Sequence, residues 1–295
     1  MNTIDVLCVG HASFDLIFSV QQHPNADEKI FADDLIACGG GPAANAAVQI
    51  AKLACSSAFA GYLGRDLYGE QHLQELIQHG VNTDLIVRGD SPTPLSTIIV
   101  KPDGKRALIN YKGNTPLTAD AIDFSNTYAK VILFDGHEPH ISVPLAETAK
   151  QHGIPMVLDA GSVHQGTLAL MGLVDYLVCS EKFAIQLKGD IHTALTELAN
   201  IAPFVVITLG EHGLIWQHGA EQGKLPALNI NAIDTTGAGD AFHGAFAAAI
   251  AKGLTWSETL NYSSIAGSLC CTKIGARLGL ATEAELNAVF KREIP

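Results

Sequence analysis

Short apolar runs alternate with helix-like segments along most of this chain. The run DVLCVG at residues 5–10 precedes the helix-like PAANAAVQIAKLA, and the same alternation recurs around VILFD, IPMVLDA, DYLVCS and FVVITLG. Runs that are apolar throughout are typical of strands buried on both faces of a parallel sheet, whose right-handed crossovers are helices. We therefore expect an α/β fold with an open, mostly parallel sheet flanked by helices, and ligands at the carboxyl ends of its strands.

Two stretches interrupt this alternation, at residues 14–37 and 94–113. In the second stretch, LSTIIVK and RALINYK flank PDGK, and a proline followed by Asp-Gly favours a turn between two strands of a β-hairpin. We expect both stretches to form a small β-sheet lid outside the main sheet. The lid is then inserted in a larger α/β domain that comprises residues 1–13, 38–93 and 114–295.

Charge and hydropathy exclude several classes of function. Eighteen Lys and Arg against thirty Asp and Glu give a net charge of −12, the wrong sign for a nucleic-acid backbone or an anionic membrane. The longest apolar run, Ala245–Ala251, is far shorter than the roughly 20 residues of a membrane helix, and no basic leader precedes it. The six cysteines show no CxxC spacing and the histidines no ligand spacing. We expect a cytoplasmic protein with reduced thiols that acts on small molecules.

The most informative segment is DTTGAGD at residues 234–240, which leads directly into an apolar helix. The free N–H groups of Gly237, Ala238, Gly239 and Asp240 would point out of the helix start, where the helix dipole also favours an anion. The Asp240 carboxylate is placed to take a proton from an attacking hydroxyl. Aspartate also caps helices routinely, and this turn alone does not separate capping from catalysis.

A second glycine-rich turn, Cys38-Gly39-Gly40-Gly41-Pro42, precedes another helix, with Asn45 in its first turns. The turn could bind hydroxyl groups or only reverse the chain. The sequence has no GxxxxGK[ST] motif and no HRD or DFG motif, which excludes a P-loop NTPase and a protein kinase. It also lacks GxGxxG, which argues against an NAD-binding protein.

Three segments together identify a family. GGGPAANAAVQIAKL with GRDLYGE at 39–70, VITLGEHG at 206–213 and IDTTGAGDAFHGAF at 233–246 resemble the PfkB (ribokinase-like) carbohydrate kinases in order and spacing. The resemblance covers essentially the whole chain. The tail SLCCTKIGARLGL and the GGGPAA turn are most similar to the branch with sulfofructose kinase and, more distantly, ketohexokinase. The resemblance implies transfer of the γ-phosphoryl group of ATP to a sugar hydroxymethyl group, with Asp240 as base and the 237–240 amides as anion hole.

The resemblance also implies a sugar site at Asp15, at the turn and helix positions Gly40, Gly41 and Asn45, and at His137 after VILFD. Lys29, Arg106 and Asn110 are further candidates because they lie on the expected lid strands. Lys29 or Arg106 would suit an anionic sugar, but an ordinary ketose is equally compatible. Each lid residue and His137 also has an ordinary alternative as a solvated charge, a sheet-edge polar group or a loop histidine.

On the nucleotide side, the resemblance implies contacts from Thr208, Gly210, Gly213, Ser264 and Gly267. Asp234 and Thr236 match the place where many relatives hold a monovalent cation such as K⁺. Relatives commonly carry Asn-x-x-Glu after the strand that corresponds to DYLVCS, whereas this chain has Ser180 and Phe183. Either Mg²⁺ is held through water and ATP oxygens, which we favour, or activity is weakened.

Two other functions and one assembly stay open at this stage. A nucleoside kinase of the same fold is the nearest alternative, and the missing Asn-x-x-Glu also allows a sugar-binding regulatory pseudokinase, although a pure binder needs no base. We expect a homodimer through apolar lid residues, with a solvated lid on a monomer as the alternative because Asp33 and Asp34 break the alternation. These lid residues are Phe14, Leu16, Phe18, Ile30, Leu95, Ile98 and Ile109.

Overall fold

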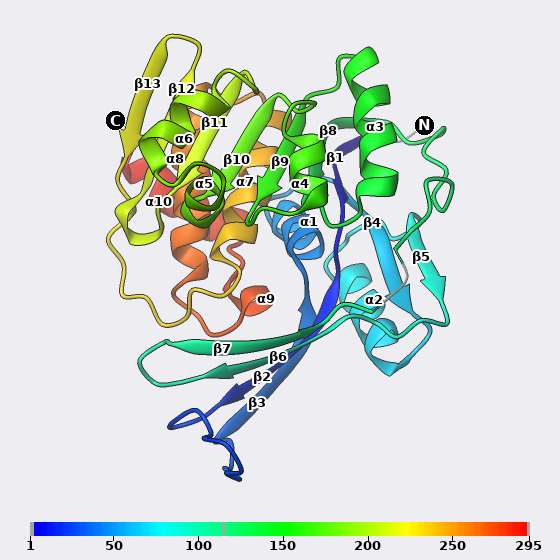
Figure 1. Ribbon diagram of the computed structural model, residues 1–295, viewed down its shortest axis with the longest axis vertical. Helices are drawn as coiled ribbons and strands as arrows, with labels where there is room; N and C mark the ends of the chain where they lie inside the picture. Colours follow the sequence, from blue (N-terminus) through cyan, green and yellow to red (C-terminus); the bar gives the residue numbers. More distant parts are fainter. Residues whose placement is uncertain (1–2, 114–115, 294–295) are drawn as a thin grey trace.

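The computed structural model describes residues 3–113 and 116–293, and the body of the protein is a nine-stranded sheet (Figure 1). Only the two strands that come last along the chain, at one edge of the sheet, form antiparallel pairs. This architecture confirms the expected open, mostly parallel α/β fold. From one edge to the other, the strands are β13 (Glu221–Leu225), β12 (Leu214–His218), β11 (Phe204–Thr208), β10 (Tyr176–Ser180), β9 (Met156–Ala160), β8 (Ala129–Phe134), β1 (Ile4–Val9), β4 (Ser57–Gly64) and β5 (Ile86–Gly89).

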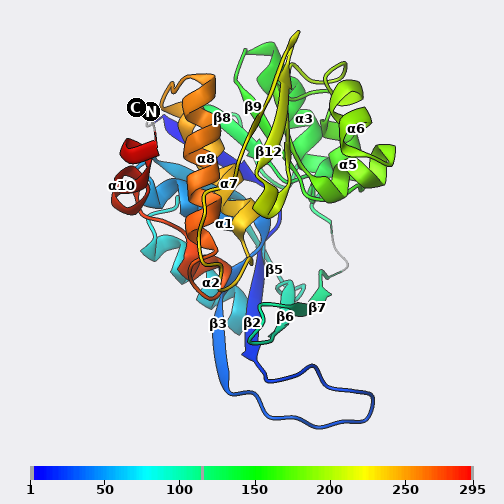
Figure 2. The ribbon, with the colours of Figure 1, turned by 90° about the vertical axis from the view of Figure 1, so that its left-hand side faces the viewer.

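Helices cover both faces of this sheet, as Figure 2 shows edge-on. Within one strand, Val6 and Cys8 pack into the core on one face, while Leu7 and Val9 pack into the core on the other. Burial on both faces explains why the central strands are apolar at most positions. One face carries α1 (Pro42–Lys52), α2 (Leu67–Gln78), α7 (Ala238–Ala251), α8 (Trp256–Cys270) and α10 (Glu283–Glu293), and the other carries α3 (Pro139–Gln151), α4 (Gln165–Leu170), α5 (Glu181–Lys188) and α6 (Ile191–Leu198).

A separate four-stranded sheet, which we call the lid, projects from one end of the body (Figure 1). The predicted hairpin is present, and PDGK forms its turn, in which Lys101 N donates to Lys105 O at 3.0 Å. The lid strands are β3 (Asp34–Gly40), β2 (Ser13–Ser19), β6 (Leu95–Val100) and β7 (Arg106–Tyr111), in that order across the sheet. The predicted boundaries at residues 1, 114 and 295 lie outside the described residues.

The strand expected over EKIFADDLIA begins only at Asp34. Residues 20–33 form an irregular, mostly exposed loop, in which Asp27 adopts a positive φ of 60°. The ladder with β2 stops where Ser19 pairs with Asp34, so Lys29 and Ile30 have no strand to pair with. Their predicted placement on lid strands is therefore wrong.

The two faces of the lid differ. On the inner face, Ile17, Ile98 and Val100 are buried in a small cluster, and a side chain at Gly275 of the body would come within 3.1 Å of Ile17 Cδ1. Strand pairing places Phe14, Leu16, Phe18, Leu95 and Ile109 on the opposite face, whereas Ile98 faces the body.

The described residues contain no helix long and apolar enough to cross a membrane. All six cysteines are buried and unpaired.

Candidate active site

The start of α7 places Asp240 at the centre of the molecule. Gly237 begins the helix with φ 77°, and a side chain there would come within 2.4 Å of Ala276 Cβ, so the turn requires glycine. The Asp240 carboxylate accepts a hydrogen bond from Asn45 Nδ2 at 2.7 Å. Burial raises the pKa of Asp240, while the Asn45 hydrogen bond and the charge of a protonated His243 oppose the rise. Asp240 is therefore a shielded carboxylate, the environment of a general base.

The first amides of α7 have the geometry that an anion-binding turn requires. Ala241 N donates to Gly237 O at 2.8 Å and begins the regular helical bonding, so the amides before it lie beyond the reach of the α-helical pattern. Ala238 N already makes a long bond of 3.3 Å to Thr235 O, which leaves Gly239 and Asp240 as the better donors for a ligand. A side chain at Gly239 would point into open space, so an anion has room to approach.

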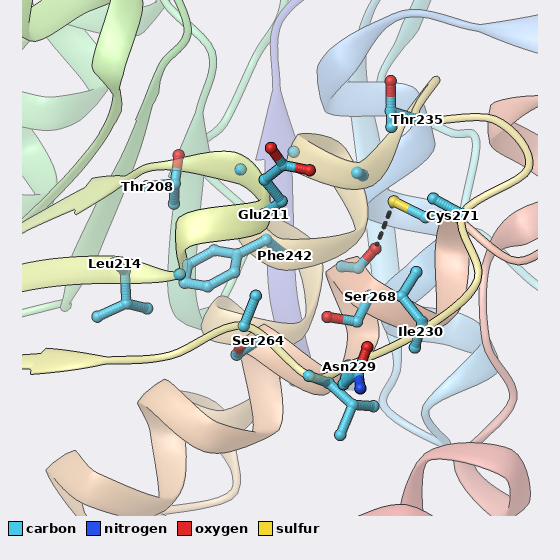
Figure 3. Close-up of a pocket in the computed structure, with 18 residues that line it drawn as sticks. Thr208, Glu211, Leu214, Asn229, Ile230, Thr235, Phe242, Ser264, Ser268 and Cys271 are labelled. Atoms are coloured by element: carbon cyan, nitrogen blue, oxygen red, sulfur yellow. Dashed lines mark hydrogen bonds between the residues drawn. The ribbon is translucent and has the colours of Figure 1, made fainter. Parts of the chain in front are cut away.

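A cavity of about 470 Å³ opens beside this turn (Figure 3). Its walls come from the ends of β11 and β12, from α7 and α8, and from the segment that leads to Thr235, with Phe242, Asn229 and Ile230 among its lining residues. All five residues predicted to contact the nucleotide line it, namely Thr208, Gly210, Gly213, Ser264 and Gly267. A largely apolar cavity that ends at free backbone amides matches the two parts of a nucleotide, its base and its phosphates.

A second cavity of about 170 Å³ lies on the far side of the turn. Asp240 and His137 line it, and Thr208 and Gly239 line both cavities. By volume it holds about six water molecules. Two further carboxylates, Asp135 and Asp159, also face it, and the sequence analysis did not identify either of them.

The lid places Asp15 beside the second glycine-rich turn, although Asp15 lines neither cavity. Asp15 is buried and accepts a hydrogen bond from Ser13 Oγ at 2.8 Å. Burial raises the pKa of Asp15, and hydrogen bonds from Ser13 and Ser96 oppose the rise. The register pairs Asp15 with Ser96 and Ser96 with Asn110, so the three polar side chains lie in a row on the inner face.

The second glycine-rich turn fits closely against the lid. A side chain at Gly40 would come within 2.2 Å of the Asp15 carboxylate, and Gly41 has φ 92° with no space for a Cβ beside His11 O. Because these two residues have no side chain, the backbone of the turn can pack directly against the Asp15 carboxylate.

His137 belongs to a group of three histidines beside the smaller cavity. Its ring stacks on His164 at 4.7 Å and meets His11 edge-on at 5.3 Å, while Lys112 Nζ lies 3.3 Å from His137 Nδ1. Burial, with the neighbouring His137, lowers the pKa of His11 and of His164 to about 4. These two rings are therefore neutral at physiological pH and suit hydroxyl groups rather than a fixed anion.

Two of the predicted sugar-binding cations lie elsewhere. Lys29 occupies the exposed loop of the lid, with its Nζ 5.8 Å from the centre of the Phe31 ring. Arg106 turns to the body, where Nη1 donates to Thr236 Oγ1 at 2.5 Å and lies 3.8 Å from Asp234 Oδ1. Neither side chain lines either cavity, and a role for either of them at the sugar stays a prediction.

At the predicted cation site, the Asp234 carboxylate is hydrogen-bonded by groups of the protein. Asp234 Oδ1 accepts from Thr236 N at 2.9 Å and Oδ2 from Gly275 N at 2.8 Å. With Arg106 beside it, this carboxylate is already neutralised and hydrogen-bonded without a metal ion. Among the residues described, no group of three or more His, Cys, Asp or Glu could hold a metal.

The two positions that replace Asn-x-x-Glu have structural roles. Phe183 is fully buried in the core. Ser180 Oγ accepts from Phe183 N at 3.0 Å, which caps α5, and donates to Gly161 O at 2.8 Å. These two residues do not fit a magnesium ion.

A buried polar network that the sequence analysis missed holds Asn45. Arg277, only 2% exposed, donates from Nε to Asn45 Oδ1 at 3.2 Å and contacts His72 Nε2 through Nη2 at 3.2 Å. Glu75 supplies the opposite charge at 3.6 Å from Arg277 Nη1 and also accepts from Gly39 N at 2.6 Å. The network fixes the amide of Asn45 toward Asp240. No motif marks Arg277 in the sequence, apart from its place in the tail that carries the family resemblance.

Comparison with known proteins agrees with this geometry. The model of the pfkB family carbohydrate kinases matches residues 3–283. The ribokinase of Lactococcus lactis subsp. lactis (strain IL1403) is 28% identical over 294 residues, which cover 97% of each chain. The crystal structure of a putative ribokinase from Agrobacterium tumefaciens has a TM-score of 0.90 at 27% identity, with 99% of each chain covered. Arabidopsis thaliana ribokinase complexed with ribose and ATP has a TM-score of 0.85 at 25% identity, over 98% of this chain and 99% of that one. The chain therefore belongs to the pfkB family and is an ATP-dependent carbohydrate kinase with the ribokinase-like fold.

Proposed function

We propose that this protein transfers the γ-phosphoryl group of ATP to a sugar hydroxymethyl group, with Asp240 as the general base. The observation that carries the proposal is the junction of the two cavities, where Gly239 and Thr208 line both and Asp240 faces the smaller one. A nucleotide in the larger cavity would present its terminal phosphate at this junction. A hydroxyl group in the smaller cavity would meet that phosphate beside the base.

The chemical step follows from these positions. Asp240 accepts the proton of the sugar hydroxyl while the hydroxyl oxygen forms a bond to the γ-phosphorus. The bond between the γ-phosphorus and the β,γ-bridging oxygen breaks, and ADP leaves. The amides of Gly239 and Asp240 stabilise the charge on the transferred group. Positioning and electrostatics therefore provide the catalysis, without a covalent intermediate on the protein.

The lid and the first helix would orient the sugar. Asn45 holds the base through the 2.7 Å hydrogen bond, and Asp15, Ser96 and Asn110 form a polar row on the lid face above it. Carboxylate, hydroxyl and amide groups bind vicinal hydroxyls well. We propose that the lid closes on the sugar and excludes water from the phosphoryl group.

We propose that the nucleotide is used as its magnesium complex, with the ion held by phosphate oxygens and water. The structural roles of Ser180 and Phe183 support this arrangement. Potassium activation stays a prediction, and the pairing of Asp234 with Arg106 gives it no support.

A coupled ATP-consumption screen tests the proposed function. The panel contains pentoses, ketohexoses, sugar acids, sulfosugars and nucleosides, with Asp240→Asn assayed in parallel to exclude a contaminating kinase. We expect turnover with a sugar of one class and its loss in Asp240→Asn. Turnover with nucleosides alone would identify a nucleoside kinase. Sugar binding without any ATP consumption would identify a regulatory pseudokinase and contradict the proposal.

We also propose a homodimer through the outer face of the lid. Leu35, Ile109 and Tyr111 are 53%, 69% and 49% exposed on this face. Among the described helices, α2 packs against only one end of the face, where the ring of Phe14 contacts Tyr68 at 5.2 Å. A contiguous apolar patch usually marks an interface, and a second copy can hide both patches with closed two-fold symmetry.

Sedimentation at micromolar concentration tests this assembly. We expect a dimer for the wild type and a monomer for Ile109→Asp. The control is Ile201→Asp, which changes an exposed isoleucine of the body (37% exposed) and should leave the dimer intact. A single wild-type species near 31 kDa would contradict the proposal.

A further inference from the structure

His243 lies in the first half of α7, three residues after Asp240, and is only 3% exposed. Its Nδ1 is 2.6 Å from Gly239 O, and its Nε2 is 3.1 Å from Val178 O in β10. Both ring nitrogens therefore face carbonyl oxygens, which only accept hydrogen bonds. The proposed phosphoryl transfer gives this ring no role.

A neutral imidazole cannot satisfy both contacts. It carries one N–H, so its other nitrogen would direct a lone pair at a carbonyl oxygen. The doubly protonated ring donates at both nitrogens and resolves the conflict. A counter-charge is at hand, because Asp159 Oδ2 lies 3.3 Å from Nδ1 and Asp159 is only 7% exposed.

We propose that His243 is a buried imidazolium paired with the Asp159 carboxylate, and that this pair is a positioning element for phosphoryl transfer. The ring holds the carbonyl of Gly239, and thereby the turn whose amides receive the phosphoryl group. Its positive charge, one helical turn from Asp240, also keeps the base deprotonated at neutral pH. The inference rests on the proposed role of Asp240 as general base.

Burial and the groups around the ring act in opposite directions. Burial has the larger effect: it lowers the pKa of His243 and, with the charges of Asp240 and Asp135, raises the pKa of Asp159 well above its ordinary value, which opposes the ion pair. The two carbonyls and Asp240 raise the pKa of His243, and a proton on its ring would offset the mutual repulsion of the neighbouring carboxyls. The hydrogen-bond geometry of the ring therefore carries the assignment. The thiols stay neutral, because burial raises their pKa far above physiological pH. The groups that face α7 here are Cys8 from β1, Asp15 from β2, Asp135 after β8, Asp159 from β9, Cys270 from α8 and Arg277 from the short helix α9 (Ala276–Gly279), with uncharged Asn45 from α1, whereas Cys179 of β10 lies on the opposite face of the sheet.

Nitrogen NMR of ¹⁵N-histidine-labelled protein tests the protonation state without requiring catalysis. The His243 signals are assigned by their loss in His243→Asn. At pH 7 we expect both ring nitrogens of His243 to carry protons in the wild type, and a neutral ring in Asp159→Asn. A neutral His243 in the wild type would overturn the inference. An imidazolium that persists in Asp159→Asn would overturn the pairing.

The pH profile of kcat/KM tests the functional consequence. Removal of a cation near Asp240 raises the pKa of that base, so in His243→Asn the acidic limb should move up by about one pH unit. At pH values below the pKa of Asp240, kcat/KM of the variant should then be about tenfold lower than that of the wild type, and the difference should disappear at alkaline pH. A loss equal at every pH would indicate a purely structural role and overturn the electrostatic part.

Ser263→Ala is the matched control. It removes a buried hydroxyl that donates to Thr259 O at 2.6 Å on α8, and it should leave the pH profile unchanged. If His243→Asn does not fold, Asp159→Asn should show a smaller upward shift of the same limb. A wild type that is inactive on every substrate would refute the proposed function, whereas the NMR result would still decide the protonation of His243.

Discussion

The substitution Asp240→Asn separates catalysis from stability in this protein. Asparagine has the same shape, and its side-chain oxygen can still accept from Asn45 Nδ2, which lies 2.7 Å from the carboxylate. The larger cavity is unchanged, so ATP should bind as in the wild type. The variant lacks only the base, and loss of a base lowers turnover by about 10²- to 10⁴-fold, or about 2.7 to 5.5 kcal/mol of barrier.

The stability of the same variant should move in the opposite direction. Burial raises the pKa of Asp240 in the folded protein above its value in the unfolded chain. The folded state therefore binds the proton more tightly, and the free energy of unfolding of the wild type falls as pH rises from the unfolded toward the folded pKa. The asparagine side chain of the variant has no such titration. The variant should be at least as stable as the wild type at pH 7, and its advantage should shrink as pH falls toward 4.

The assays are steady-state kinetics with the best sugar, ATP titration by calorimetry, and urea unfolding at several pH values between 4 and 8. The other buried carboxyls titrate in both proteins, so the difference between the two unfolding curves isolates Asp240. Near-wild-type kcat would refute the role of Asp240 as base. A variant that loses stability as pH rises, relative to the wild type, would refute the assignment of a raised pKa.

Three further predictions follow from the network, the lid contact and the proposed closure. Glu75→Gln leaves the Arg277 cation buried without its nearest carboxylate and should lower the free energy of unfolding by about 3 kcal/mol, whereas the double variant Glu75→Leu/Arg277→Met should recover most of this loss in urea unfolding. Arg106→Ala removes a partly exposed contact to Thr236 and should cost less than about 1 kcal/mol in unfolding while it raises the KM for the sugar several-fold, and an unchanged KM would show that this contact does not hold the lid. The true sugar should tighten ATP binding in calorimetry, and equal ATP affinity with and without it would rule out coupled closure.

Local sequence patterns were sufficient for much of the fold. The alternation around DVLCVG and VILFD predicted the parallel strands, and PDGK predicted the β6–β7 hairpin, because both signals depend on neighbours a few residues apart. The strand β4 and the antiparallel hairpin β12–β13 were not predicted. The strands of this hairpin are only partly buried, so their apolar pattern is weaker than that of the central strands, whereas β4 is buried along nearly its whole length.

Local patterns do not predict contacts between residues far apart along the chain. Lys29 was expected on a lid strand but lies in an exposed loop, and Arg106 contacts Thr236 across a separation of 130 residues, while a contact of either residue with the sugar stays a prediction. The branch within the family stays a prediction, since none of the relatives described above tests it.

The sequence by itself determined the βα turn at DTTGAGD, because glycine conformations and free amides at a helix start depend on residues within one turn. The family resemblance of the sequence also indicated residues that line the larger cavity, at the end of β11, in the turn after it and within α8. Only the tertiary structure decided which polar and charged groups lie next to the base. Asn45 is 195 residues from Asp240, and Arg277 is 232 residues from Asn45. The physical reason is that a buried polar group takes whatever partner the packed elements bring within about 3 Å, and no local pattern encodes that proximity.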